Sequence, residues 1–115
     1  METYDVRFLQ DALDDTEEIV LYIAKDNPSA ALRMHDEIIE KANNLSPFPR
    51  RGPLVPDPKM RKAGFRMLFI HPYIAFYRII GNFVFIYRVV HGATNYPLLY
   101  KKMVQDSNLM PESLL

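Results

Sequence analysis

The sequence predicts a single α+β domain in which an N-terminal strand and two helices precede a run of β-strands. Apolar residues recur at helical spacing from residue 11 to residue 44, whereas residues 65–91 form β-rich runs of strand length. A Gly81-Asn82 pair separates two of these runs and indicates a β-hairpin. The 115 residues are 49% hydrophobic and include no cysteine, so a core can form without disulfides or thiolate metal sites.

The N-terminal part is expected to form a strand followed by a helical hairpin. Tyr4, Val6 and Phe8 alternate with Asp5, Arg7 and Leu9, as in a short strand. Residues 11–26 have an apolar stripe at helical spacing and acidic residues in the first turns, where the helix dipole favours negative charge. Asn27-Pro28 then supplies an N-cap and a first helical residue for a second helix that extends to about residue 44. The short link predicts that the two helices are antiparallel.

Residues 46–64 are predicted to form a loop, since five of the nine prolines lie there. A loop of this length in a compact domain is usually functional or mobile, and the alternative is a covering segment stiffened by proline. Strands are expected over 65–70, 73–80 and 83–91, and a short helix or strand from Tyr96 to about Gln105. We therefore predict a domain over residues 1–105 and a flexible tail over 106–115.

The predicted hairpin is apolar on both faces. A two-residue turn pairs Ile80 with Phe83 and Arg78 with Phe85. One face then carries Ile74, Phe76, Arg78, Ile80, Phe83, Phe85, Tyr87, Val89 and His91, and the other carries Tyr73, Ala75, Tyr77, Ile79, Val84, Ile86, Arg88 and Val90. The helical hairpin covers only one face, so the other needs the C-terminal segment, a second copy in a homodimer, or a different protein.

Charge is distributed unequally along the chain, although the net charge is zero. Residues 1–45 contain four basic and eleven acidic side chains, whereas residues 46–115 contain ten basic and three acidic ones. Such asymmetry indicates nucleic acid or another polyanion as a partner of the basic half, unless the two halves neutralise each other in the fold. The candidate binding residues are Arg50, Arg51, Lys59, Arg61, Lys62 and Arg78.

The residues available for chemistry suit metal-independent RNA cleavage. The sequence has no Gly-rich phosphate loop and no His/Asp/Glu cluster with metal-ligand spacing, so we expect neither a metal nor a cofactor. Cleavage needs a base, an acid and cations around the phosphate. Arg66 is a candidate cation, and His91 and Tyr100 are candidate proton carriers. His91 is expected within reach of Arg66, Arg78 and Tyr100, but a histidine at a strand end more often caps the strand.

Several stretches in order resemble the RelE/ParE superfamily of bacterial type II toxins, which includes plasmid-stabilisation proteins. The resemblance covers residues 4 to about 101. It rests on Ile19-x-x-Tyr22-Ile23-Ala24, Asn27-Pro28-x-Ala30-Ala31, Leu45-x-x-x-Pro49-x-x-Gly52, Arg66, Tyr73-x-x-Phe76-Tyr77-Arg78 and His91-Gly92-x-x-x-Tyr96.

This resemblance implies a helical hairpin packed on a twisted antiparallel sheet, and a cognate antitoxin whose helix or strand wraps the toxin. RelE-like members cut mRNA on the ribosome, and ParE-like members inhibit DNA gyrase. Arg66 and Tyr100 match the nuclease pattern, but Ile74 and Thr94 occupy positions that are often arginine in the nucleases. We therefore expect a growth-arresting toxin whose ParE-like binding activity fits the missing arginines. The alternatives are an mRNA endonuclease and an inert interaction module.

The expected location is the cytoplasm. The N-terminus lacks the basic start and apolar run of a signal peptide, and no apolar stretch approaches the roughly 18 residues that span a bilayer.

Overall fold

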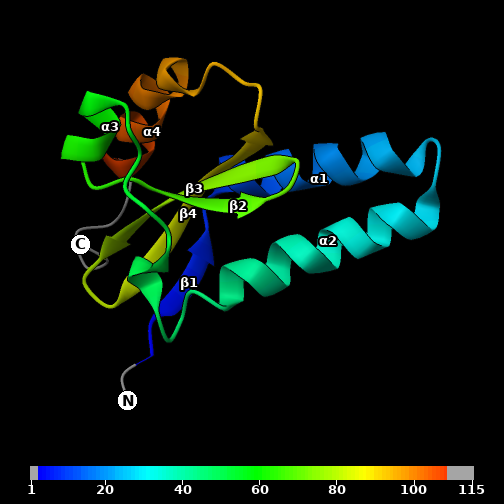
Figure 1. The fold of residues 1–115 in the computed structure, drawn as a ribbon, viewed down its shortest axis with the longest axis horizontal. Coiled ribbons are helices and arrows are strands. Elements are labelled where there is room, and N and C mark those ends of the chain that lie inside the picture. The colour runs from blue at the N-terminus through cyan, green and yellow to red at the C-terminus, as the bar shows by residue number, and fades with distance from the viewer. Residues whose placement is uncertain (1–2, 109–115) are drawn as a thin grey trace.

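The computed structural model describes residues 3–108, and residues 1–2 and 109–115 lie outside that description (Figure 1). In chain order the elements are β1 (Asp5–Phe8), α1 (Gln10–Ala24), α2 (Pro28–Asn43), the 3₁₀ turn η1 (Pro49–Arg51), α3 (Pro58–Lys62), β2 (Arg66–Ile70), β3 (Tyr73–Ile80), β4 (Phe83–His91), the 3₁₀ turn η2 (Tyr96–Leu99) and α4 (Tyr100–Asn108). The predicted α+β class is confirmed.

The four strands of the described residues form one mixed sheet in the order β1-β4-β3-β2. β2, β3 and β4 are antiparallel, and the expected pairs Ile80–Phe83 and Arg78–Phe85 are present. β1 departs from the expected antiparallel sheet because it pairs parallel to β4, with Asp5 opposite Phe83. Both long helices, β2 and β3 lie between β1 and β4 in the chain, so no tight turn joins the two strands and requires them to be antiparallel.

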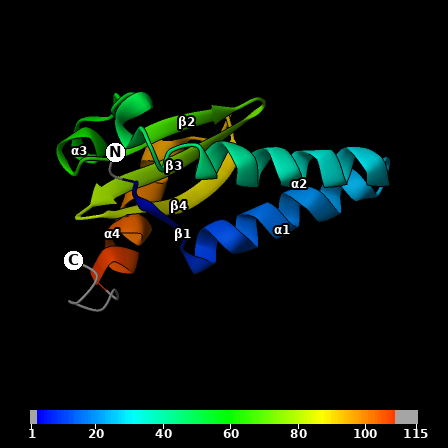
Figure 2. The same cartoon turned by 90° about the horizontal axis from the view of Figure 1, so that it is seen from below.

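The helical hairpin covers one face of the sheet (Figure 2). The cap predicted at Asn27 is confirmed, since its side chain accepts a hydrogen bond from the Ala30 N–H at 3.0 Å. Fully buried side chains of the two helices, including Ala12 and Ile38, pack against Tyr77, Ile86 and other residues of the central strands.

The other face is covered by α3 and α4, so the surplus apolar surface predicted from the sequence is buried within the chain. Met60 of α3 and Met103 of α4 are fully buried and join one cluster with sheet residues such as Phe76 and Phe85. Figure 1 shows both helices on the side of the sheet opposite α2. Three candidates were considered for covering this face of the sheet, and the structure shows the C-terminal segment there. The helix α3, from the proline-rich segment, covers the same face.

The prediction of a loop over residues 46–64 is wrong at α3. Asp57 accepts a hydrogen bond from the Met60 N–H at 3.1 Å, and Pro58 is the first helical residue. A capping residue followed by proline also begins α2. In α3, however, the helix has only five residues, which is too short to show an apolar stripe at helical spacing.

A β-bulge in β4 overturns part of the predicted face assignment. Phe76 pairs with Arg88 but the next residue, Tyr77, pairs with Ile86, so Tyr87 is the extra residue. Side chains after the bulge therefore exchange faces. Val89 packs on the side of the helical hairpin, whereas Val90 packs with the α3–α4 side, the reverse of the alternation expected from the sequence.

The C-terminal helix α4 continues to Asn108, three residues beyond the predicted domain boundary at 105. The rest of the predicted tail, residues 109–115, lies outside the described residues.

Candidate functional site

Five of the candidate binding cations are exposed, two on η1 and three on α3, and we call these five side chains together the cationic surface. It consists of Arg50, Arg51, Lys59, Arg61 and Lys62. Within residues 3–108, no carboxylate lies at ion-pair distance from any of the five. Uncompensated exposed cations of this kind attract anionic partners.

The two halves of the chain neutralise each other only in part. In the described part of the chain, two ion pairs join them: Arg88 with Asp15 at 2.7 Å and Lys102 with Asp11 at 3.6 Å. The alternative of full internal compensation is therefore not observed.

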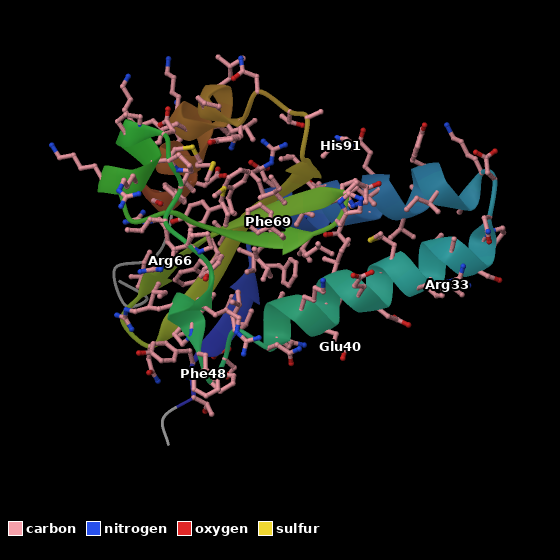
Figure 3. All side chains as sticks on the ribbon, viewed as in Figure 1. Arg33, Glu40, Phe48, Arg66, Phe69 and His91 are labelled. Atoms are coloured by element: carbon pink, nitrogen blue, oxygen red, sulfur yellow. The ribbon has the colours of Figure 1, made fainter. Side chains whose placement is uncertain are left out.

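Arg66 adjoins the cationic surface, but its guanidinium group serves the fold. Its Nη1 donates to the Gly52 carbonyl at 2.8 Å and more weakly to the Arg50 carbonyl at 3.4 Å. The side chain thereby fixes η1 against the start of β2. Arg66 is half-buried, and Figure 3 shows it beside this connection.

Arg78, the sixth candidate, is held beneath α4. Its Nη1 donates to Ser107 Oγ at 3.0 Å and to the Tyr87 hydroxyl at 3.4 Å, and Tyr87 also hydrogen-bonds Ser107. The guanidinium carbon lies 5.2 Å from the centre of the Phe65 ring, within the range of a cation–π interaction. Arg78 therefore stabilises the contact between α4 and the sheet.

His91 caps the end of β4, which is the alternative role considered for it. Its Nδ1 accepts a hydrogen bond from the Ala93 N–H at 3.0 Å, and its ring meets Tyr73 edge-on at 5.9 Å. The Nδ1 atom therefore already has a hydrogen-bond partner in the turn that follows β4.

The structure does not bring Arg66 and His91 together. Arg66 lies opposite Tyr77, whereas His91 lies opposite Tyr73, four residues away along β3. That offset is about 13 Å along the strand direction at about 3.3 Å per residue. Figure 3 shows the two labelled side chains at different ends of the sheet. Tyr100, the third candidate, is the first residue of α4. It is half-buried and packs against the cluster that includes Met60 and Met103.

A buried tyrosine that was not among the predicted site residues anchors η1, which carries Arg50 and Arg51 of the cationic surface. The Tyr77 hydroxyl donates to the Pro49 carbonyl at 2.7 Å and accepts from the Gly52 N–H at 3.0 Å. A methyl group on Gly52 would lie 2.3 Å from the Met67 carbonyl oxygen, so only glycine fits there. The sequence analysis noted the motif Pro49-x-x-Gly52 and, separately, Tyr77. That they form one hydrogen-bonded unit could not be predicted, because Gly52 and Tyr77 are 25 residues apart in the sequence.

Neither a metal centre nor a membrane span is found among residues 3–108. Among these described residues, no group of three His, Asp or Glu side chains is placed to hold a metal ion. No helix in the same range has the length and apolar character that crossing a membrane requires.

Most of the chain matches a known protein family. Residues 6–96 match the family model described as the ParE toxin of the type II toxin–antitoxin system parDE. This chain belongs to the ParE toxin family. The match runs from Val6 in β1 to Tyr96, the first residue of η2, and so includes the cationic surface and all of the sheet except Asp5.

Solved structures have the same fold as this ParE-family chain. One neighbour is from the chromosomal ParDE toxin–antitoxin system of P. aeruginosa, with 22% sequence identity and a TM-score of 0.66, over 76% of this chain and 95% of the other. Another is from the toxin–antitoxin complex RelBE2 of Mycobacterium tuberculosis, with 28% identity and a TM-score of 0.59, over 77% and 98% of the two chains. No curated protein sequence matches this chain.

Proposed function

We propose that this chain is the toxin of a type II toxin–antitoxin pair that is neutralised in the cytoplasm by a cognate antitoxin. We further propose that the free toxin arrests growth by binding DNA gyrase and does not cut mRNA. Membership of the ParE family supports the toxin role. Both solved neighbours come from toxin–antitoxin systems, which supports the antitoxin partner.

The observation that carries the gyrase proposal is the separation of the nuclease candidates. Cleavage of RNA by protein groups needs a base, an acid and cations around one phosphate. Here the Arg66 guanidinium is bound to the Gly52 carbonyl, and His91 receives the Ala93 N–H at another end of the sheet. A binding toxin needs a surface and no converging groups, and the cationic surface offers one.

Ribosome-dependent mRNA cleavage is the second candidate, and one observation favours it. Arg66 lies beside cations that have no acidic partner among the described residues, and such a surface also suits an RNA backbone. On this alternative, Arg66 and Tyr100 act on the substrate, so changing either one removes toxicity.

Pulse-labelling in bacteria that lack the antitoxin separates the two functions. After induction of the chain, we expect thymidine incorporation to fall first while methionine incorporation continues. The variant Tyr100→Phe should arrest growth as the wild type does, since the proposed mechanism gives its hydroxyl no role. Tyr22→Phe is the matched control, because that side chain is 69% exposed on α1.

The contrary outcomes are distinct. An early fall in methionine incorporation that Tyr100→Phe abolishes would establish the nuclease and reject the gyrase proposal. Growth without arrest, with folded chain present in the cells, would leave an interaction module and reject the toxin role.

A further inference from the structure

A pocket of about 660 Å³ lies where the chain before β1 meets η1. It is lined by Tyr4 and by the continuous segment 47–51, which includes Phe48, Arg50 and Arg51. The three residues considered for catalysis do not line it. Figure 3 shows Phe48 near the start of β1, at the other end of the view from His91. The pocket is therefore distinct from the end of β4.

Hydrogen bonds hold both walls of the pocket in place. The Tyr4 N–H donates to the Ser46 carbonyl at 2.9 Å, and Ser46 Oγ donates to the Tyr4 carbonyl at 2.7 Å. On the other wall, the Pro49 carbonyl accepts the buried Tyr77 hydroxyl at 2.7 Å. The pocket is thus formed before a ligand arrives, which lowers the cost of binding.

Phe48 supplies an open aromatic surface in this pocket. Its side chain is 55% exposed, and the guanidinium carbon of Arg51 lies 5.8 Å from the centre of its ring. Phe69 on β2 is 54% exposed, but within residues 3–108 no cation lies over its ring. An exposed aromatic ring beside a guanidinium group is the arrangement on which a nucleobase stacks.

Arg50 and Arg51 place positive charge beside this ring. Both are exposed, and among the described residues neither has a carboxylate at ion-pair distance. Asp5, which follows Tyr4 in the chain, is already paired with Arg7 at 2.7 Å. Guanidinium groups bind phosphate oxygens through two parallel hydrogen bonds. The pocket thus combines a surface for a flat ring with groups for a phosphate.

We propose that this pocket binds one nucleotide unit of a single-stranded nucleic acid, with the base stacked on Phe48 and the phosphate bound by Arg50 and Arg51. A base inside a duplex is already stacked on both sides, whereas a single strand presents a free ring face. Stacking accepts any base, so binding needs no particular sequence. The inference goes beyond the proposed function, because binding gyrase requires no contact between this chain and nucleic acid.

A strand fits this pocket better than a free nucleotide or an acidic peptide. The pocket is open to solvent, whereas sites for small molecules bury about 70–90% of their ligand. A strand gains further phosphate contacts from the units on either side, which a free nucleotide lacks. An acidic peptide would pair with the arginines but would leave Phe48 without a flat partner.

Fluorescence anisotropy with labelled oligonucleotides tests this inference. Three probes of equal charge, each about 12 nucleotides long, would be titrated: oligo-dT, oligo-U, and an abasic sugar-phosphate strand. We expect the abasic strand to bind about fivefold or more weakly than oligo-dT, because it has no base to stack. The ratio of the affinities for oligo-dT and oligo-U shows whether the site prefers DNA or RNA. Unlabelled thymidine 5′-monophosphate should compete only at far higher concentration than oligo-dT.

Two matched pairs of variants locate the binding. Phe48→Ala should weaken oligo-dT binding about fivefold or more and Phe48→Trp should preserve it, whereas Phe69→Ala, outside the pocket, should change it by less than about twofold. Arg51→Ala should reduce the slope of log K against log salt by about 0.7, the value for one phosphate contact with a single strand. Arg33→Ala, an exposed change on α2, should leave that slope unaltered. Figure 3 shows Phe48, Phe69 and Arg33 in separate parts of the molecule.

Four results would overturn the inference. They are no binding of oligo-dT up to about 100 μM, the weak end of non-specific binding; equal affinity for the abasic strand; equal affinities of folded Phe48→Ala and Phe69→Ala; or displacement of oligo-dT by an acidic peptide or the mononucleotide as effectively as by the strand. Growth arrest by the free chain is a separate readout. Arrest without oligonucleotide binding rejects this site alone, whereas binding without arrest rejects the toxin role and leaves the site.

Discussion

At the scale of single residues, Tyr77 joins the sheet to η1, the part of the cationic surface that carries Arg50 and Arg51. Its side chain is fully buried, and its hydroxyl group satisfies one backbone donor and one backbone acceptor in the segment before β2. The Tyr77 hydroxyl can approach this backbone only because residue 52 is glycine. A β-carbon there would lie 2.5 Å from the hydroxyl oxygen. The position of Arg50 and Arg51 thus depends on one buried hydrogen-bonding group.

We predict that Tyr77→Phe lowers the free energy of unfolding by about 2 kcal/mol or more. The substitution leaves the Gly52 N–H and the Pro49 carbonyl without their partner, and each unsatisfied buried group costs about 1–3 kcal/mol. Urea denaturation followed by circular dichroism measures the change. The exposed control Tyr22→Phe should alter stability by less than about 0.5 kcal/mol. Equal values for the two variants would show that the anchor is unimportant.

The same hydroxyl predicts how stability changes at alkaline pH. Burial raises the pKa of Tyr77 above its ordinary value of 10.0. The unfolded chain therefore releases this proton from about pH 10, while the native chain retains it, and stability falls as pH rises through this range. Tyr77→Phe should reduce the slope of stability against pH above about pH 10 and leave it unchanged below. An unchanged alkaline slope would contradict this assignment.

At the scale of elements, Asp15 attaches α1 to β4. Its side chain is 13% exposed and that of Arg88 is 21% exposed. The hydrogen bond that Arg88 donates to the Asp15 carboxylate raises the pKa of Arg88, so the guanidinium group stays charged. One carboxylate thus supplies the acceptor that a longer β1 would otherwise have provided to Val89.

We predict that Asp15→Ala lowers the free energy of unfolding by about 3 kcal/mol, because it leaves Arg88 and the Val89 N–H without a partner. The control Asp14→Ala changes an exposed neighbour in the same helix and should cost less than about 1 kcal/mol. Adding Arg88→Met to Asp15→Ala should recover part of the loss, since no unpaired charge then remains. Urea denaturation of all four proteins tests this, and a double variant no better than Asp15→Ala would contradict it.

Elements with a repeating pattern were predictable from the sequence, and irregular ones were not. The long helices and the β3–β4 turn followed from apolar periodicity, the Asn27 cap and Gly81-Asn82, all of which are local signals. α3 is too short to show a period, and the bulge at Tyr87 changes the face of every later residue of β4 without a local signal. The separation of Arg66 from His91 depends on strand register, which one sequence does not reveal for distant residues.

At the scale of the whole molecule, the opposite charges of the two halves remain largely separate. The acidic helical hairpin and the cationic surface lie in different parts of a molecule measuring 41 × 35 × 25 Å (Figure 1). Only two ion pairs in residues 3–108 cross between the halves. The chain therefore has no net charge but a strong internal asymmetry, and its acidic and basic surfaces suit different partners.

This asymmetry predicts that the free chain self-associates at low ionic strength. Acidic and basic surfaces of neighbouring molecules attract, and zero net charge offers no general repulsion. The Debye length is about 30 Å in 0.01 M salt, comparable to the molecule, but about 8 Å in 0.15 M salt. We expect light scattering at pH 7 to give an apparent mass that decreases toward 13.4 kDa as NaCl rises from about 10 to 150 mM. Asp36→Lys/Glu40→Lys, which removes acidic charge from α2, should weaken the association in low salt. An apparent mass that increases with salt would instead indicate association through apolar surface such as Leu21 and Tyr22.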